Sequence, residues 1–167
     1  MLLSRMNNQI LKPIIETIEK PKDIMRYFKI LARGKRNTIL FESKDIVSRY
    51  GDFSIGSNDP CLKISGKKEM FEILALNDLG INMLKDLKEK LHFCDEIKYE
   101  KNKIIGKLSI KSKIRSGDEI ERLQKINHTD ILRVLAFSYK PKRVPKHPYG
   151  GLFGVFSYDF IDQLENL

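Results

Sequence analysis

The sequence predicts an α+β fold in which helices pack against a mostly antiparallel sheet. Short alternating or β-branched runs recur between turn residues, which is typical of strands. Longer segments between them carry apolar residues at helical spacing. Several of the short runs also follow one another across brief turns, which indicates an antiparallel meander.

The first quarter of the chain is predicted to alternate between extended and helical segments. Residues 13–19 are β-branched and bounded by prolines, which predicts a strand. Residues 23–32 carry apolar side chains near helical spacing, which predicts a helix before a turn at 34–37. Residues 38–42 favour β structure and predict a strand that ends in a carboxylate.

Three strands and a helix are predicted next. The strands lie at residues 53–55, 61–64 and 70–76. A five-residue turn at 56–60 joins the first two into a hairpin, and Gly66-Lys67 forms the next turn. Asn77 and Asp78 can cap a helix over 79–91, because their side chains accept the free N–H groups of the first turn. The apolar stripe of this helix consists of Ile81, Leu84, Leu87 and Leu91.

Two strands and two helices are expected after that helix. The strands lie at residues 97–99 and 104–110, around a turn at 100–102. Ser116 and Glu119 have the spacing of a capping box, which predicts a helix to about residue 126. Thr129 is expected to begin another helix, with one apolar side made of Ile131, Leu132, Leu135 and Tyr139.

The last part of the chain is predicted to be a connector, a buried strand and a short helix. Three prolines within residues 140–148 predict an exposed connector. Residues 150–158 are glycine-rich, aromatic and apolar, which predicts a buried strand with close backbone approach. Asp159 can cap a final helix. That helix has room for about two turns, so we expect the chain to be a piece of a longer protein.

Composition favours one soluble domain over residues 1–167. The chain has 41% hydrophobic residues, which is ordinary for a globular protein and argues against disorder. No run approaches the roughly 18 to 20 apolar residues of a membrane span, and the first residues do not resemble a signal peptide. Cys61 and Cys94 are isolated and predict reduced thiols, so we expect a cytoplasmic location and no membrane partner.

The positive charge is concentrated in one segment. The formal net charge is +9, and residues 98–146 hold 14 Lys+Arg and 5 Asp+Glu. Such a segment is compatible with nucleic-acid binding. Its only aromatics are Tyr99, Phe137 and Tyr139, and no known DNA- or RNA-binding motif is present. We therefore favour a solvated face and a connector, and expect no nucleic-acid partner.

The residues alone reveal no catalytic constellation and no metal site. His92, His128 and His147 have no carboxylate or cysteine at ligand spacing, and a surface or capping role is expected for His92. Ser157 does not lie in a nucleophile elbow, and the glycines at 150–154 lack the lysine of a phosphate-binding loop. We predict no catalytic residue, metal ligand or cofactor site in this chain.

Two stretches together resemble the N-terminal region of anthranilate synthase component I, a family of chorismate-utilising enzymes. The sequence ILFES at 39–43, followed by GDFSIGSNDP at 51–60, is similar to the family's LLES strand and the hairpin after it. The sequence YGGLFGVFSYD at 149–159, with Glu165 beyond it, is similar to the family's GG-x-x-G-x-x-x-YD stretch. The order and separation of the two motifs carry the resemblance, which covers essentially the whole chain.

The resemblance implies a lyase of tryptophan biosynthesis that converts chorismate to anthranilate with Mg²⁺ and ammonia. In this family a glutaminase subunit supplies the ammonia, and the catalytic and metal-binding residues belong to a larger chorismate-binding domain that is absent here. The chain would then be part of a larger two-layered fold and inactive by itself. The family's N-terminal domain contributes to the site of feedback inhibition by tryptophan, and the motif match assigns Glu42, Ser43 and Leu40 to that site.

The residue chemistry is compatible with an amino-acid effector. Glu42 can pair with an ammonium group, the Ser43 hydroxyl can hydrogen-bond, and Leu40 and Phe41 can form an apolar wall. The same residues can also simply end a strand and begin a turn. Phe41 replaces a leucine and Phe53 a tyrosine of the family pattern, which affects the strength of inhibition. Component I of aminodeoxychorismate synthase, in the folate pathway, shares parts of the pattern and is the alternative, beside a basic nucleic-acid-binding module.

Overall fold

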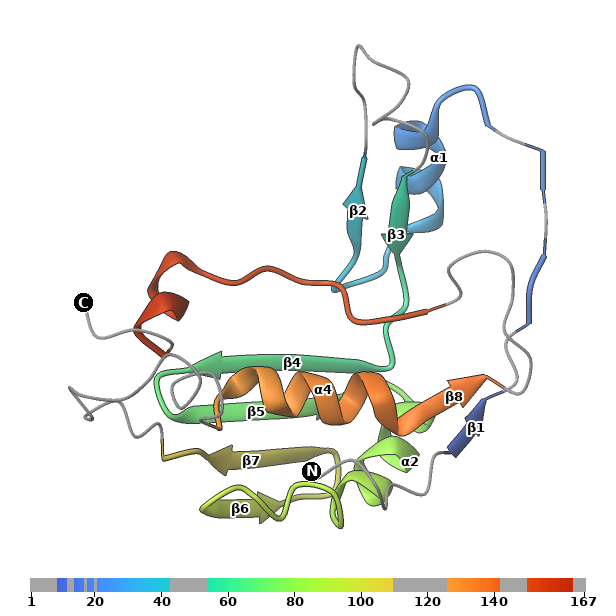
Figure 1. Cartoon of the computed structure of the whole chain (residues 1–167). Coiled ribbons are helices and arrows are strands. Elements are labelled where there is room, and N and C mark those ends of the chain that lie inside the picture. Colours follow the sequence, from blue (N-terminus) through green and yellow to red (C-terminus); the bar gives the residue numbers. More distant parts are fainter. Residues whose placement is uncertain are drawn as a thin grey trace. The chain divides into compact units, whose positions relative to one another are not determined.

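A four-stranded antiparallel sheet is the largest element of the computed structural model (Figure 1). The structure describes residues 9–11, 14–16, 18–19, 21–42, 54–109, 126–141 and 150–163. The sheet has the order β4-β5-β7-β6, with bounds β4 Leu62–Lys67, β5 Met70–Ala75, β6 Glu96–Tyr99 and β7 Lys103–Lys107. Together with the helices, this sheet confirms the predicted α+β class.

The chain divides into two compact units. The larger unit consists of residues 1–13 and 61–167 and contains the four-stranded sheet, and the smaller unit consists of residues 14–60. No helix in the described part of the chain has both the length and the apolar character needed to cross a bilayer.

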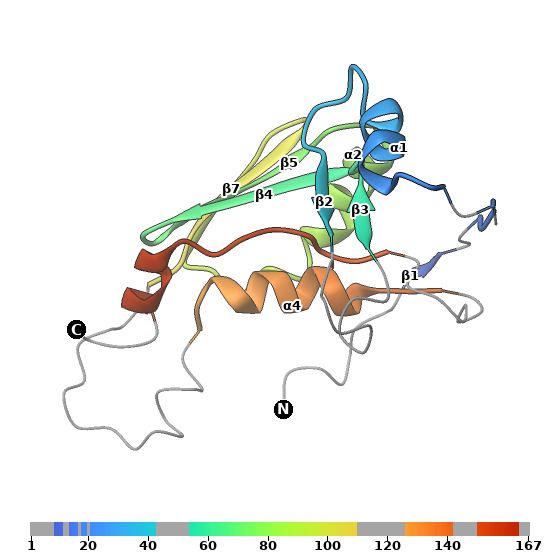
Figure 2. The same ribbon diagram turned by 90° about the horizontal axis from the view of Figure 1, so that it is seen from above.

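Two helices cover one face of the sheet in the larger unit. Helix α2 spans Asp78–Leu87, and helix α4 spans His128–Ser138 and lies along the strands (Figure 2). Alternate residues of β5 and β7 are buried, as expected for strands with one covered face. The core joins strand, loop and helix residues: Phe71, Ile73, Ala75, Leu84, Leu87, Leu91, Ile104, Leu108, Ile131 and Leu135. The predicted stripe is confirmed for Leu84 and Leu87, with Ile81 packed at its edge, but α2 ends at Leu87 and Leu91 enters the core from the loop beyond it.

The opposite face of the sheet carries lysines and glutamates in ion pairs. Lys103 lies 3.6 Å from Glu72 on the neighbouring strand, and Lys98 lies 3.0 Å from Glu100. The first lysines of the basic segment 98–146 thus lie on an exposed sheet face beside carboxylates. This arrangement is typical of the solvated side of an antiparallel sheet.

The β4–β5 turn lies two residues beyond its predicted position. The structure places the turn at Lys68 and Glu69, where Lys68 has φ +53°, and keeps Gly66 within β4. The ring of His128 packs over Gly66, where an added Cβ would lie 2.9 Å from the ring Cδ2. The glycine therefore serves close packing in a strand rather than a turn, which explains the incorrect prediction.

A short parallel strand pair corrects the predicted connector. Strand β1, Gln9–Leu11, pairs in parallel with β8, Tyr139–Pro141, directly after α4. The prediction of an irregular segment from residue 140 is thus wrong for its first two residues. Pro141 ends the strand, where a missing N–H disrupts little pairing.

The smaller unit contains one helix and one two-stranded antiparallel sheet. Its elements are α1 Ile24–Leu31, β2 Ile39–Phe41 and β3 Ile55–Ser57. Asp23 caps α1 by accepting a hydrogen bond from the N–H of Arg26 at 2.8 Å. The predicted helix at 23–32, turn at 34–37 and strand at 38–42 are confirmed.

Two strand predictions around the smaller unit are wrong. The described residues within 13–19 form no strand, because β-branched composition alone supplies no neighbouring strand to pair with. The hairpin of 53–55 with 61–64 does not form either. Strand β3 pairs with β2 instead, and the expected turn residues Gly56 and Ser57 lie within β3. An alternating pattern predicts a strand but does not name its partner.

The glycine-rich segment near the end of the chain differs most from its prediction. Residues 150–157 form no strand, and Val155, Phe156 and Tyr158 are 87%, 60% and 85% exposed. An added Cβ at Gly150, Gly151 or Gly154 would meet nothing within 4 Å, so no close backbone approach exists here. A 3₁₀ helix, η1 Tyr158–Gln163, lies where a capped α-helix was expected.

Some predicted elements lie outside the described residues. They are the connection at 43–51, the capping box of Ser116 and Glu119 with most of its helix, and the connector beyond residue 141.

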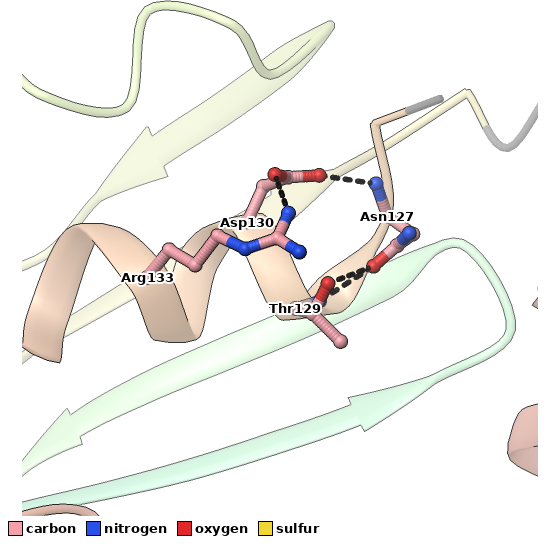
Figure 3. Close-up of polar contacts among 4 residues, drawn as sticks. All are labelled: Asn127, Thr129, Asp130 and Arg133. Carbon is pink, nitrogen blue, oxygen red and sulfur yellow. Dashed lines mark hydrogen bonds and ion pairs between the residues drawn. The ribbon is translucent and has the colours of Figure 1, made fainter. Parts of the chain in front are cut away.

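Helix α4 begins with a capping box that the sequence analysis did not identify (Figure 3). Asn127 Oδ1 accepts a hydrogen bond from the Thr129 N–H at 2.8 Å, and the Asn127 N–H donates to Asp130 Oδ2 at 2.9 Å. Arg133 Nη1 donates to the other Asp130 oxygen at 2.8 Å. The helix therefore begins one residue earlier than the predicted Thr129, since asparagine and aspartate here take the places of serine and glutamate.

Replacing Gly80 by alanine is expected to destabilise the larger unit. Gly80 is buried in α2, and an added Cβ would overlap the carbonyl group of Cys61. That carbonyl already accepts a 2.9 Å hydrogen bond from the Leu76 N–H, which limits its movement. Overpacking costs about 1–3 kcal/mol, and urea unfolding should show a loss of this size. The matched control is Gly154→Ala, where a comparable loss would contradict the explanation.

Removing the cap of α4 is expected to lower stability by a smaller amount. Asn127→Ala leaves first-turn N–H groups without their acceptor, which costs about 1 kcal/mol. Chemical unfolding followed by circular dichroism measures the difference. Asn82→Ala, an exposed change inside α2, is the control. Equal free energies of unfolding for Asn127→Ala and the parent chain would contradict a stabilising cap.

Candidate functional site

The effector residues assigned by resemblance lie at the end of β2. Leu40 is half-buried within the strand, and Glu42 follows directly after it and is exposed. Ser43 lies outside the described residues. The structure thus places Leu40 and Glu42 two residues apart at one strand end.

Helix α1 holds this strand end through β3. Leu40 pairs with Gly56 in the β2–β3 register. An added Cβ at Gly56 would lie 2.8 Å from Phe28 Cε2 and 3.2 Å from Leu40 Cδ1, so the ring and the leucine both crowd the glycine. Sequence reasoning missed this contact. The available signals were the apolar face of the helix and a glycine directly after the alternating residues 53–55, since a glycine in a strand often marks close approach.

Two polar contacts also connect α1 and the following turn with the residues after β3. Asn58 Nδ2 donates a 3.1 Å hydrogen bond to the Leu31 carbonyl at the end of α1. Lys35 Nζ lies 2.8 Å from Asp59 Oδ2, and both side chains are exposed. An exposed pair of this kind contributes at most about 1 kcal/mol, so the apolar contact at Gly56 is the more important one.

Leu40 and Phe41 cannot line one wall of the sheet. Neighbouring strand residues point to opposite faces, and Phe41 pairs with Ile55 on the face opposite Leu40. An effector that contacts Leu40 therefore contacts the face on which Phe28 lies. Phe41 and Ile55 provide a separate apolar surface on the other side.

The carboxylate of Glu42 is available to a ligand. Within the part of the chain that the structure describes, it takes part in no ion pair or hydrogen bond. It is also exposed, so pairing it with a cation displaces water and breaks no contact with another described residue. This is the one group of the candidate site with strong hydrogen-bonding capacity and no competing partner among the described residues.

The cysteines are unsuited to nucleophilic chemistry. Burial and the charge of Asp95 raise the pKa of the Cys94 thiol to about 11. Burial also raises the pKa of the Cys61 thiol, which lies 3.5 Å from Met83 Sδ. A nucleophilic cysteine needs a lowered pKa, because the thiolate is the reactive form.

The described histidines have structural surroundings. His92 is exposed near the end of α2, with Nδ1 3.4 Å from the Glu89 carbonyl, which confirms its expected surface position. His128 is buried, and its Nε2 lies 3.1 Å from the Met70 carbonyl. Among the described residues no three His, Cys, Asp or Glu side chains gather as a metal ion would require.

Comparison with curated proteins connects the chain with one enzyme. Anthranilate synthase component 1 of Buchnera aphidicola from Baizongia pistaciae is 34% identical over 148 residues, covering 84% of this chain. The chain is homologous to anthranilate synthase component 1. The same enzyme of Buchnera aphidicola subsp. Acyrthosiphon pisum is 32% identical over 142 residues. That of Buchnera aphidicola subsp. Rhopalosiphum maidis is 31% identical over 160 residues.

The match to anthranilate synthase component 1 involves only part of each relative. The aligned stretch is 26–30% of their length, so the chain spans about a quarter of the curated relatives it matches. No model of a protein family matches the chain, and no solved structure matches it. The resemblance seen in the two sequence motifs is confirmed by these relatives.

The partly buried thiol of Cys94 is expected to resist alkylation. With a pKa of about 11, roughly one molecule in 1,000 carries a thiolate at pH 8, against about one in four for a free cysteine. Iodoacetamide should therefore modify Cys94 in a Cys61→Ser variant far more slowly than it modifies a small thiol, with a rate that rises to pH 11. A rate that levels off near pH 8.5 would contradict the burial of this thiol.

Proposed function

We propose that the chain is the regulatory and structural N-terminal part of a cytoplasmic anthranilate synthase component 1. In this proposal it carries part of the site where tryptophan inhibits the enzyme. The observation that carries the proposal is the carboxylate of Glu42 at the end of β2, which is exposed and has no partner among the described residues, in a chain homologous to component 1.

The proposed effector site uses complementary charges. The tryptophan ammonium group pairs with the Glu42 carboxylate through a charge-assisted hydrogen bond, which is about twice as strong as a neutral one. The Ser43 hydroxyl adds a further polar contact. Leu40 contributes apolar surface beside the indole ring, on the face of the sheet that also bears Phe28.

The chemistry of the enzyme is assigned to other parts of it. Conversion of chorismate to anthranilate is proposed to take place in the chorismate-binding domain, with ammonia from a glutaminase subunit and Mg²⁺ as the metal. The described residues contain no group of three His, Cys, Asp or Glu side chains that could hold a metal ion, so the proposal assigns Mg²⁺ binding to the chorismate-binding domain. Our proposal is that the 167-residue chain by itself is inactive.

The exposed apolar segment at residues 150–158 is the proposed contact with the chorismate-binding domain. Leu152, Val155, Phe156 and Tyr158 all expose large side chains in and directly after a segment without regular structure. Leaving such a set in water is unfavourable, and contiguous exposed apolar groups mark interaction surfaces. The curated relatives are three to four times longer than the aligned stretch, which leaves ample partner surface.

The two alternatives gain less support. The nucleic-acid hypothesis requires free positive charge, but Lys98, Lys103 and Lys107 lie beside glutamates on the sheet face. Component I of aminodeoxychorismate synthase remains the nearest alternative within chorismate chemistry. Four curated relatives, all named anthranilate synthase component 1, favour the tryptophan pathway.

A chimeric enzyme tests the proposal. The chain replaces the matched part of the component 1 from Buchnera of Baizongia pistaciae, and anthranilate formation is measured with increasing tryptophan. We expect inhibition, and we expect Glu42→Gln to raise the inhibition constant about tenfold or more, because it removes a charged hydrogen-bond acceptor. The control Glu19→Gln changes another exposed glutamate of the smaller unit and should leave inhibition unchanged.

Direct binding gives an independent measurement. The chain itself contains no tryptophan and adds no indole fluorescence, and the chimera without ligand supplies the baseline for the remaining residues. Anisotropy of that fluorescence should rise when the chimera is added and should rise much less with Glu42→Gln. An active chimera that neither binds tryptophan nor is inhibited by it would contradict the effector role.

A further inference from the structure

The smaller unit is held together by few contacts. None of its described residues is fully buried, and α1 has no buried side chain. The position of the β2 end therefore depends on individual contacts with α1 rather than on a large core. One of these contacts is the Phe28 ring beside Gly56, where an added Cβ would lie 2.8 Å from Phe28 Cε2.

We propose that Phe28 is a positioning residue for the effector site, an inference that rests on the proposed function. The ring crowds Gly56 of β3, which pairs with Leu40 of β2. Glu42 follows two residues after Leu40, directly beyond the end of β2. Phe28 thus acts on Glu42 through the strand pair, and it needs no contact of its own with the ammonium group.

The energetic reason is preorganisation. A strand end that samples several positions must be ordered when the ligand binds, and that ordering reduces affinity. The Phe28 ring restricts β3 at Gly56, so it restricts the paired β2 and the carboxylate beyond it. A smaller side chain at position 28 leaves the carboxylate chemically intact but less often in the binding position.

The absence of a side chain at Gly56 gives the Phe28 ring the space that this positioning requires. An added Cβ would lie 2.8 Å from Phe28 Cε2 and 3.1 Å from the Ile39 carbonyl oxygen. The ring is the end of a side chain and can move away, whereas the carbonyl belongs to the paired strand. Gly56→Ala should therefore displace the ring, and a smaller residue at position 28 should relieve the crowding. The two substitutions are expected to be coupled.

A double-mutant cycle in the chimera tests this inference. The variants are Phe28→Leu, Gly56→Ala and the double variant, each measured for tryptophan inhibition and for anisotropy of bound tryptophan. Each single change should raise the inhibition constant about three- to tenfold. The double variant should show a smaller rise than the product of the two. Because residues in contact also couple in stability, the rate of anthranilate formation without tryptophan is measured for each variant and should remain that of the parent chimera.

The matched control is Ile30→Ala on the same helix. Ile30 is 64% exposed, and residues two positions apart on a helix do not share a face, so this change should leave tryptophan inhibition as in the parent chimera. If Ile30→Ala weakens inhibition as much as Phe28→Leu does, or if the cycle is additive, Phe28 has no specific positioning role.

The experiment separates this inference from the proposed function. If Glu42→Gln loses inhibition while Phe28→Leu is inhibited like the parent, the effector site stands and the positioning role is wrong. If the active parent chimera is insensitive to tryptophan, the proposed function itself is wrong, and the positioning role is wrong with it.

Discussion

The burial of one sheet face beneath α2 and α4 is the constraint on which the larger unit depends. Strands β5 and β7 occupy the centre of the sheet, and every second residue of each is buried against the helices. Fully burying a side chain such as Ile73 or Leu87 contributes roughly 1.5–3 kcal/mol. The close approach at Gly80 and the glycine beneath His128 are consequences of bringing the helices this near to the sheet.

The smaller unit follows a different principle. It has no comparable core among its described residues. Its helix is joined to its strands by the Phe28 ring beside Gly56 and by the polar contacts of Asn58 and Asp59. Low local stability of this kind is common in elements that respond to ligands. The proposed regulatory site at the end of β2 is therefore consistent with the small number of contacts that hold the smaller unit together.

The lysines of the solvated sheet face lie beside carboxylates, which accounts for the first part of the basic segment 98–146. A net charge of +9 is large for 167 residues, but the lysines on β6 and β7 alternate with inward-facing apolar residues and lie beside glutamates. The exposed aromatic segment after residue 150 is the more informative surface, since apolar groups in water favour association.

Local patterns in the sequence determined the helix at 23–32 and the strands at 38–42 and 70–76. They also determined the apolar positions Leu84, Leu87 and Leu91. The reason is that the periodicity of an element is a local property. The sequence motifs also indicated the homology with anthranilate synthase component 1, and they identified Leu40 and Glu42 as candidate effector residues. Tertiary structure decided strand partners: β3 pairs with β2 rather than with β4, and β8 pairs with β1 across most of the chain. It also decided that Gly66 and Gly56 lie in strands beneath aromatic rings. Pairing and close packing join residues distant in sequence, and no local pattern records which surfaces will meet.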